Sequence, residues 1–232
     1  MTADDRVREI LSVQAGRSGL DVADASFFSP KEFQATWKLK GNSVSVKISD
    51  YLSDAPDAVL SEFASALFDM VGGRKPTYGG RYMEWVTSDD FINDKRKTYL
   101  RRSKNLKVDH VGAEKDLASS LDRLLESGLV LPSDIENSVF TWTSRPNIRR
   151  VGYCSPMMRV VAVSSALDDP AVPDEVADFV VYHEALHLRQ GYRPSSRLHD
   201  AQFREMERMF PGFNNAESYL RRIGSKRRYH VR

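Results

Sequence analysis

The stretch DFVVYHEALHLRQ, residues 178–190, decides how the rest of the chain is interpreted. Its two histidines, His183 and His187, are four residues apart, so on an α-helix their imidazoles project from one face, one turn apart. Glu184 points about 100° around the same helix, where its carboxylate can reach a water molecule on a cation between the histidines. This HExxH spacing is typical of zinc hydrolases, and it predicts two metal ligands and a general base.

The residues around the two histidines are mostly apolar, which indicates a helix in the interior of a domain. They are Val176, Ala177, Phe179, Val180, Val181, Ala185, Leu186 and Leu188. A buried polar side chain without a partner costs about 1 to 3 kcal/mol, and a metal ion with its water would supply that partner here. The alternative is a helix that carries two incidental histidines.

A catalytic zinc site takes three protein ligands and keeps one position open, so a third ligand must come from outside this helix. His199 lies near the start of the next predicted helix, RLHDAQFREMERMF, and is the candidate. Glu205 and Glu217 are the alternatives, because some HExxH enzymes take a glutamate from a following helix. The longer HExxHxxGxxH pattern is absent, since Arg193 occupies its third histidine position.

Length and composition predict a soluble globular protein. The 232 residues, 41% of them hydrophobic, are enough for one large domain or two small ones. No apolar run approaches the roughly 18 to 20 residues of a membrane span, and the first residues, MTADDRVREI, lack the apolar core of a signal peptide, so we expect a cytoplasmic location. The single cysteine, Cys154, excludes an internal disulfide and any cysteine-rich zinc ribbon, and we interpret it as structural.

The formal charge of +2 hides an asymmetry between the two parts of the chain. Residues 1–94 hold 10 basic and 15 acidic side chains, a net −5, whereas residues 95–232 hold 24 and 17, a net +7. After Glu217 the C-terminal tail carries six positive charges and no acid: Arg221, Arg222, Lys226, Arg227, Arg228 and Arg232. Weak nucleic-acid binding through the basic surface and this tail is one interpretation. A solvated basic end is the other.

The order of the predicted elements indicates an α+β protein. A helix over residues 3–14, a hairpin over 33–51 and a helix over 55–71 predict an N-terminal α/β region, residues 1–130, of unknown role. A further helix is expected over 113–127, and Pro132-Ser133-Asp134 marks the expected boundary. Beyond it, residues 131–232 form the second domain, where the strands VFTWT and RVVAVSS (159–165) predict a small antiparallel sheet packed on the HExxH helix. If strand 159–165 is the sheet edge, it binds extended substrate by strand addition.

Residues 138–223 resemble the SprT-like and YgjP-like group of predicted zinc metallopeptidases. The matching parts are FTWTSRPNIRR, the DFVVYHEALHL helix, the spacing from His199 to Phe203, and a trailing FPGF. The resemblance implies a zincin-like catalytic domain with Zn²⁺ bound by His183, His187 and His199 and with Glu184 as general base. Residues 1–130 and the missing cysteine-rich C-terminal ribbon depart from the family.

These observations predict a zinc metallopeptidase that hydrolyses peptide bonds. Three neutral imidazoles on zinc lower the pKa of its water toward about 7, and Glu184 then takes the proton as the water attacks the carbonyl. Two other functions remain open. One is a metal-dependent nucleotide phosphoanhydride hydrolase, although no P-loop or acidic metal cluster is present. The other is a metal-stabilised nucleic-acid-binding protein with a structural zinc.

Overall fold

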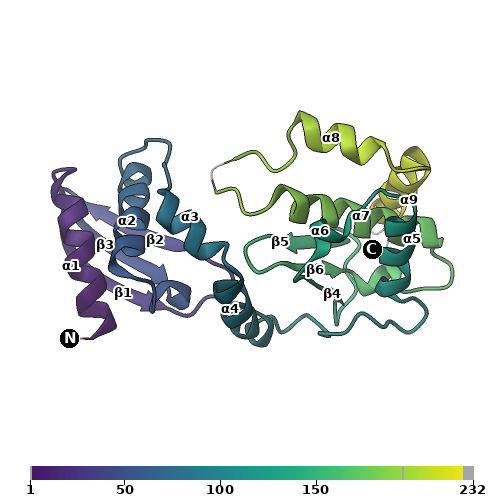
Figure 1. The fold of residues 1–232 in the computed structure, drawn as a ribbon, viewed down its shortest axis with the longest axis horizontal. Coiled ribbons are helices and arrows are strands. Elements are labelled where there is room, and N and C mark those ends of the chain that lie inside the picture. The colour runs from purple at the N-terminus through teal and green to yellow at the C-terminus, as the bar shows by residue number, and fades with distance from the viewer. Residues whose placement is uncertain (1, 195, 227–232) are drawn as a thin grey trace, which may run out of the picture. The chain divides into compact units, whose positions relative to one another are not determined.

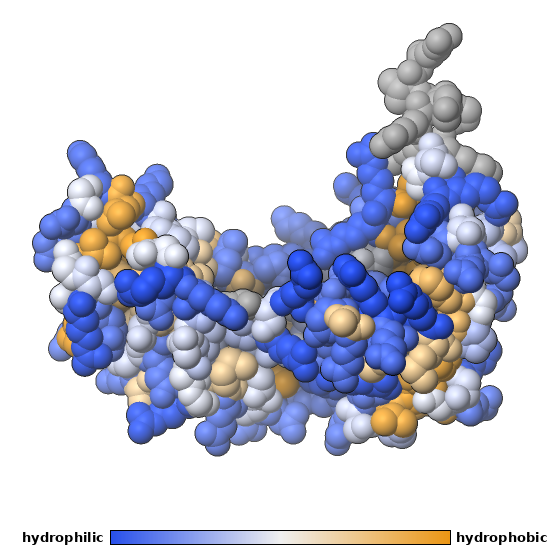
Figure 2. Space-filling view, turned by 90° about the horizontal axis from the view of Figure 1, so that it is seen from above, coloured by the Kyte–Doolittle hydropathy of each residue, from blue (hydrophilic) through white to orange (hydrophobic). Residues whose placement is uncertain are grey.

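A computed structural model describes residues 2–194 and 196–226 and has a mixed α+β fold (Figure 1). This part of the chain contains nine α-helices and two three-stranded sheets, which confirms the predicted α+β class. The chain divides into two compact units, Met1–Arg102 and Ser103–Arg232, each with its own sheet. None of the described helices is both long and apolar enough to span a bilayer. Hydrophilic residues cover most of the face seen in Figure 2.

The first unit has one three-stranded sheet with helices α1 and α2 packed against it (Figure 1). Its elements are α1 (Ala3–Gly16), β1 (Asp21–Phe28), β2 (Ala35–Lys40), β3 (Ser43–Ser49), α2 (Asp57–Val71), α3 (Gly80–Val86) and α4 (Asp89–Arg102). The predicted hairpin is confirmed, because β2 and β3 pair antiparallel around the turn at Gly41. The predicted helices over 3–14 and 55–71 are confirmed as α1 and α2. Strand β1, which pairs parallel with β3, was not predicted.

Buried and more exposed side chains alternate along most of β3, so one face of this sheet is packed in the interior. Val44, Val46 and Ile48 are almost fully buried and share one face of the strand, as the two-residue period of a strand requires. Phe63 and Leu67 of α2 are also buried in this unit. The first unit therefore has a hydrophobic core of its own.

The second unit is built around one long helix, α7 (Asp174–Gln190). The other elements are α5 (Leu117–Glu126), α6 (Pro132–Ile135), β4 (Val139–Trp142), β5 (Gly152–Ser155), β6 (Val160–Val163), α8 (Ala201–Arg208) and α9 (Phe213–Lys226). Helices α5, α6, α8 and α9 and strands β5 and β6 contact α7 directly. Twelve of the seventeen residues of α7 are buried, as the apolar sequence predicts.

The predicted antiparallel sheet is wrong in one respect: the sheet is mixed. Its strand order is β4-β6-β5, with β4 parallel to β6 and β5 antiparallel to β6. Strand β5 was not predicted. It lies between β4 and β6 in the sequence and runs opposite to both, so β6 is parallel to β4. The expectation that strand 159–165 forms the edge is also wrong, because β6 lies in the middle of the sheet and β5 forms an edge.

The expected domain boundary after residue 130 differs from that of the structure, which lies after Arg102. The predicted helix over 113–127 is present as α5, but Leu117 and Leu124 pack in the same hydrophobic core as α7, as does Val130. Asp178 of α7 also accepts two hydrogen bonds of 2.7 Å from Arg123 of α5. Residues 103–130 therefore belong to the unit that carries the HExxH helix.

Candidate metal centre

Helix α7 begins and ends at residues suited to those positions. Pro173 precedes it, Asp174 and Glu175 occupy the first turn, where the helix dipole favours negative charge, and Gly191 follows it with φ of +70°. Near its last turn, Arg189 donates hydrogen bonds of 2.6 and 3.0 Å to Asp134 of α6. The helix that carries the HExxH residues is therefore anchored near its C-terminal end and buried along most of its length.

Three histidines come together between α7 and the start of α8. Each of His183, His187 and His199 offers one ring nitrogen, and these three atoms all lie within 4.8 Å of one another. The Nε2 atoms of His187 and His199 are 3.1 Å apart. Two nitrogens bound about 2.05 Å from a tetrahedral zinc would lie roughly 3.3 Å apart, so this pair has the spacing of two ligands of one ion.

His199 is held at the start of α8 by the residues that follow it. Asp200 caps the helix, with its Oδ1 accepting a 2.8 Å hydrogen bond from the backbone N–H of Phe203. The Phe203 ring is fully buried, and its centroid lies 5.1, 4.6 and 4.7 Å from those of His183, His187 and His199. The HxxxF spacing thus brings together the third histidine, just before α8, and one apolar wall of the cluster, from the first turn of α8.

Glu207 hydrogen-bonds to the first histidine, a contact that was not predicted. Its Oε1 lies 2.6 Å from His183 Nδ1, which fixes the proton on Nδ1 and leaves Nε2 as a free electron-pair donor. Burial disfavours the charged imidazole, but the hydrogen bond to Glu207 and the negative charges of Glu184 and Glu207 together outweigh burial and raise the pKa of His183. The same bond lowers the pKa of Glu207. A carboxylate of this kind commonly orients a metal-binding histidine.

The two glutamates considered as alternative third ligands lie elsewhere. Glu205 is exposed on α8, and Glu217 on α9 pairs with Arg221 at 2.6 Å. Within residues 2–194 and 196–226, the only group of three or more potential ligands is the three-histidine cluster. The structure therefore brings together all three predicted histidines and neither glutamate.

The two remaining imidazoles are biased toward the neutral form that binds metal. Burial, followed by the positive charge of His183, lowers the pKa of His187 to about 4. The same two causes lower the pKa of His199. Since a ligand imidazole must be unprotonated, the lowered pKa values of His187 and His199 favour cation binding near neutral pH, whereas the raised pKa of His183 opposes it.

Glu184 lies beside this cluster, buried and without a hydrogen-bond donor among the described residues. Burial raises the pKa of Glu184 to about 7, with the charges of His183 and Arg150 acting in the opposite direction. Its neighbour across the gap to the sheet is Gly152 of β5, where an added Cβ would lie 2.5 Å from Glu184 Oε1. Gly152 was not predicted, and it allows the edge strand to pass directly over the carboxyl group.

Cys154 faces the same side of β5 as Gly152 and is consistent with a structural role. Burial, followed by the charge of Glu184, raises the pKa of its thiol well above the ordinary value. The side chain packs against the hydrophobic core of the second unit. A thiol held in its protonated form is a poor metal ligand.

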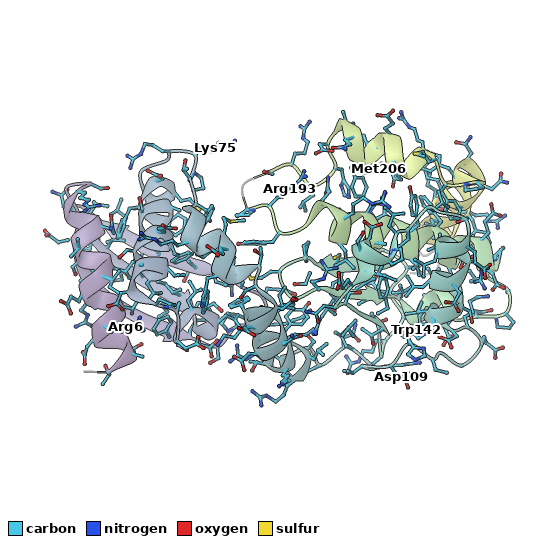
Figure 3. All side chains as sticks on the ribbon, in the orientation of Figure 1. Arg6, Lys75, Asp109, Trp142, Arg193 and Met206 are labelled. Carbon is cyan, nitrogen blue, oxygen red and sulfur yellow. The ribbon has the colours of Figure 1, made fainter. Side chains whose placement is uncertain are left out.

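Helix α8 is held against α7 by direct contacts near the cluster. The Tyr182 hydroxyl donates a 2.6 Å hydrogen bond to the backbone carbonyl of Met206, and Arg189 Nη1 lies 3.5 Å from the Met206 sulfur. Figure 3 marks Met206 on α8 and Arg193 on the loop that joins the two helices. The third histidine therefore comes from a helix that is itself fixed to the HExxH helix.

The basic tail lies partly outside the described residues. Arg227, Arg228 and Arg232 fall there, so the expected nucleic-acid contact of the tail remains a prediction. Within α9, Arg222 lies over the ring of Tyr219 at 4.8 Å.

No known family model matches this chain, and no curated protein or solved structure is significantly similar to it. The resemblance to SprT-like metallopeptidases thus remains a prediction made from the residues.

Proposed function

We propose that this chain is a zinc-dependent metallopeptidase. The observation that carries the proposal is the cluster of three imidazole nitrogens within 4.8 Å, formed by His183, His187 and His199, with the buried carboxyl group of Glu184 on the same helix. Three imidazoles are the ligand set of several catalytic zinc sites. In the described part of the chain no fourth His, Cys, Asp or Glu joins the group, which favours an open coordination position over a closed structural site.

The chain's own residues supply the rest of the proposed chemistry. When bound, zinc would acidify water and polarise the substrate carbonyl. The Glu184 carboxylate takes a proton from the attacking water and then delivers it to the nitrogen of the leaving amine. Glu207 holds His183 in the tautomer that presents Nε2 to the metal.

The substrate is proposed to bind as an added strand along β5. This strand pairs with β6 on one side only, and its Gly152 lies against Glu184. An extended peptide that pairs with the free edge of β5 would run past the general base, and its backbone would gain hydrogen bonds from the strand. The edge proposed for substrate is therefore β5, in place of the strand at 159–165.

The decisive test replaces the general base without removing the metal. Glu184→Gln should bind zinc with the affinity of the wild type, because it leaves all three histidines in position. It should lose peptide hydrolysis by at least about a hundredfold, because an amide cannot accept the proton. Denatured proteins incubated with zinc-loaded wild type and variant, and analysed by mass spectrometry, give the result. Equal hydrolysis by the two proteins would refute the proposed role of Glu184.

A further inference from the structure

Two arginines without an acidic partner precede the edge strand of the second unit. Arg149 and Arg150 are exposed, and no carboxylate in the described ranges pairs with either guanidinium group. By contrast, Arg123 and Arg189 in the same unit are each paired with a buried aspartate at 2.7 and 2.6 Å. Arg149 and Arg150 therefore carry positive charge that the fold itself does not neutralise.

The loop that carries these arginines is anchored to the sheet. Asn147 Oδ1 accepts hydrogen bonds of 2.9 and 3.1 Å from the backbone N–H groups of Arg149 and Arg150. The backbone N–H of Asn147 donates a 2.7 Å hydrogen bond to Ser164 Oγ, a fully buried group directly after β6. An anchored backbone reduces the conformational entropy that binding would otherwise cost.

The Arg150 side chain also has a defined direction. Its guanidinium carbon lies 4.6 Å from the centre of the Tyr153 ring, within the range of a cation–π contact. Tyr153 belongs to β5, so the charge is held over the strand proposed to bind substrate. Stacking on the ring leaves the planar edge of the guanidinium free to bind a carboxylate with two hydrogen bonds.

Arg149 and Arg150 lie close in the sequence to the residue of β5 that contacts the proposed general base. Gly152, which lies against Glu184, is only two residues from Arg150, about 7 Å along an extended chain. A peptide bound along β5 would thus bring side chains two or three residues from the cleaved bond close to Arg149 and Arg150.

We propose that Arg149 and Arg150 form a specificity subsite for an acidic side chain, so that the enzyme prefers to cleave peptides with Asp or Glu near the cut. This proposal rests on the peptidase function proposed above. A carboxylate there forms charge-assisted hydrogen bonds with the guanidinium groups, whereas a lysine or arginine in the substrate is repelled.

Peptide binding to an inactive form tests the subsite separately from catalysis. Zinc-loaded Glu184→Gln protein is titrated, with fluorescence anisotropy as the readout, into two labelled ten-residue peptides, one alternating Ala and Asp and the other alternating Ala and Lys. We expect the Asp peptide to bind at least about fivefold more tightly than the Lys peptide. A fivefold difference is about what one exposed ion pair contributes at the upper end of its range. Adding Arg149→Glu and Arg150→Glu should reverse the preference.

A matched control separates the subsite from the total charge of the protein. Lys38→Glu with Lys40→Glu makes the same change in net charge on exposed residues of β2 in the first unit. Equal binding of the two peptides, or the same loss of preference in the control, would overturn the proposal.

A cut-site profile distinguishes failure of the subsite from failure of the peptidase function. Wild-type protein with zinc is incubated with a mixture of unfolded proteins, and the cut sites are mapped by mass spectrometry. Cleavage without enrichment of Asp or Glu within three residues of the cut would refute the subsite and leave the peptidase. Absence of cleavage would refute both.

Discussion

Replacing Glu207 tests how the metal-binding geometry is held. Glu207→Ala removes the carboxylate 2.6 Å from His183 Nδ1, so the ring can rotate and its proton can move to Nε2, the atom offered to the metal. Loss of such a partner costs about 10-fold to 100-fold in metal affinity, or about 1.4 to 2.8 kcal/mol. Glu207→Gln should lose less, because its amide oxygen still accepts the hydrogen bond from Nδ1.

The assay is competition for zinc between the apoprotein and a chromogenic chelator near neutral pH. Glu205→Ala is the matched control, because Glu205 lies two residues away on α8 and is exposed. We expect its zinc affinity to equal that of the wild type. The reasoning fails if Glu207→Ala binds zinc as tightly as the wild type, or if the control loses as much affinity.

Three further predictions concern the third ligand, the strand beside Glu184 and the hydrogen bonds of Asp168. His199→Ala should lose zinc affinity by at least about tenfold in the chelator assay, whereas Glu217→Ala should keep it; the reverse would identify Glu217 as the third ligand. Gly152→Ala should reduce hydrolysis with zinc still bound, because the new Cβ displaces the Glu184 carboxyl group, while Gly16→Ala, which meets open space, should not; equal activity would refute the close approach. Burial raises the pKa of Asp168, but hydrogen bonds of 2.6 to 3.0 Å from three backbone N–H groups, together with the charge of Lys107, outweigh burial and lower that pKa. A carboxyl group whose pKa is lower in the folded state than in the unfolded state, about 3.9, stabilises the fold at pH values above 3.9. Asp168→Asn should therefore lower the free energy of unfolding, measured in urea, by about 1 to 3 kcal/mol near pH 7 and by progressively less below about pH 4. A difference that is independent of pH would contradict this.

The sequence was most informative where periodicity and spacing are strong. The apolar residues around His183 and His187 predicted a buried helix, and the four-residue spacing predicted a shared face, which the structure has. His199 was predicted to approach from the next helix, and its nitrogen is in the cluster. The cap at Asp200 and the ring of Phe203 give the physical reason for that approach.

The two missed strands, β5 and β1, have weak strand propensity. Strand β5 reads GYCS and follows three arginines, and β1 reads DVADASFF, with acids and small residues that strands usually lack. Both strands are fixed by pairing with a β-branched neighbour, β6 and β3 respectively, so tertiary contacts override local preference. Missing β5 led directly to the wrong sheet order and to the wrong edge strand.

Contacts between residues that are far apart in the sequence could not be predicted from sequence patterns. The bond from Glu207 to His183 spans 24 positions, and no spacing rule distinguishes Glu207 from Glu205 before the rotation of α8 is known. The close approach of Gly152 to Glu184 depends in the same way on which strand forms the edge. The domain boundary was misplaced because the proline at 132 marks the start of α6 within a unit that begins at Ser103.

The most direct test of the central claim is a crystal structure of the zinc-soaked protein with anomalous diffraction recorded at the zinc edge. We expect one anomalous peak about 2.0 to 2.1 Å from a ring nitrogen of each of His183, His187 and His199, with the fourth position facing Glu184 and β5. No peak at the three histidines, or a peak whose fourth ligand is another protein side chain, would contradict a catalytic zinc site.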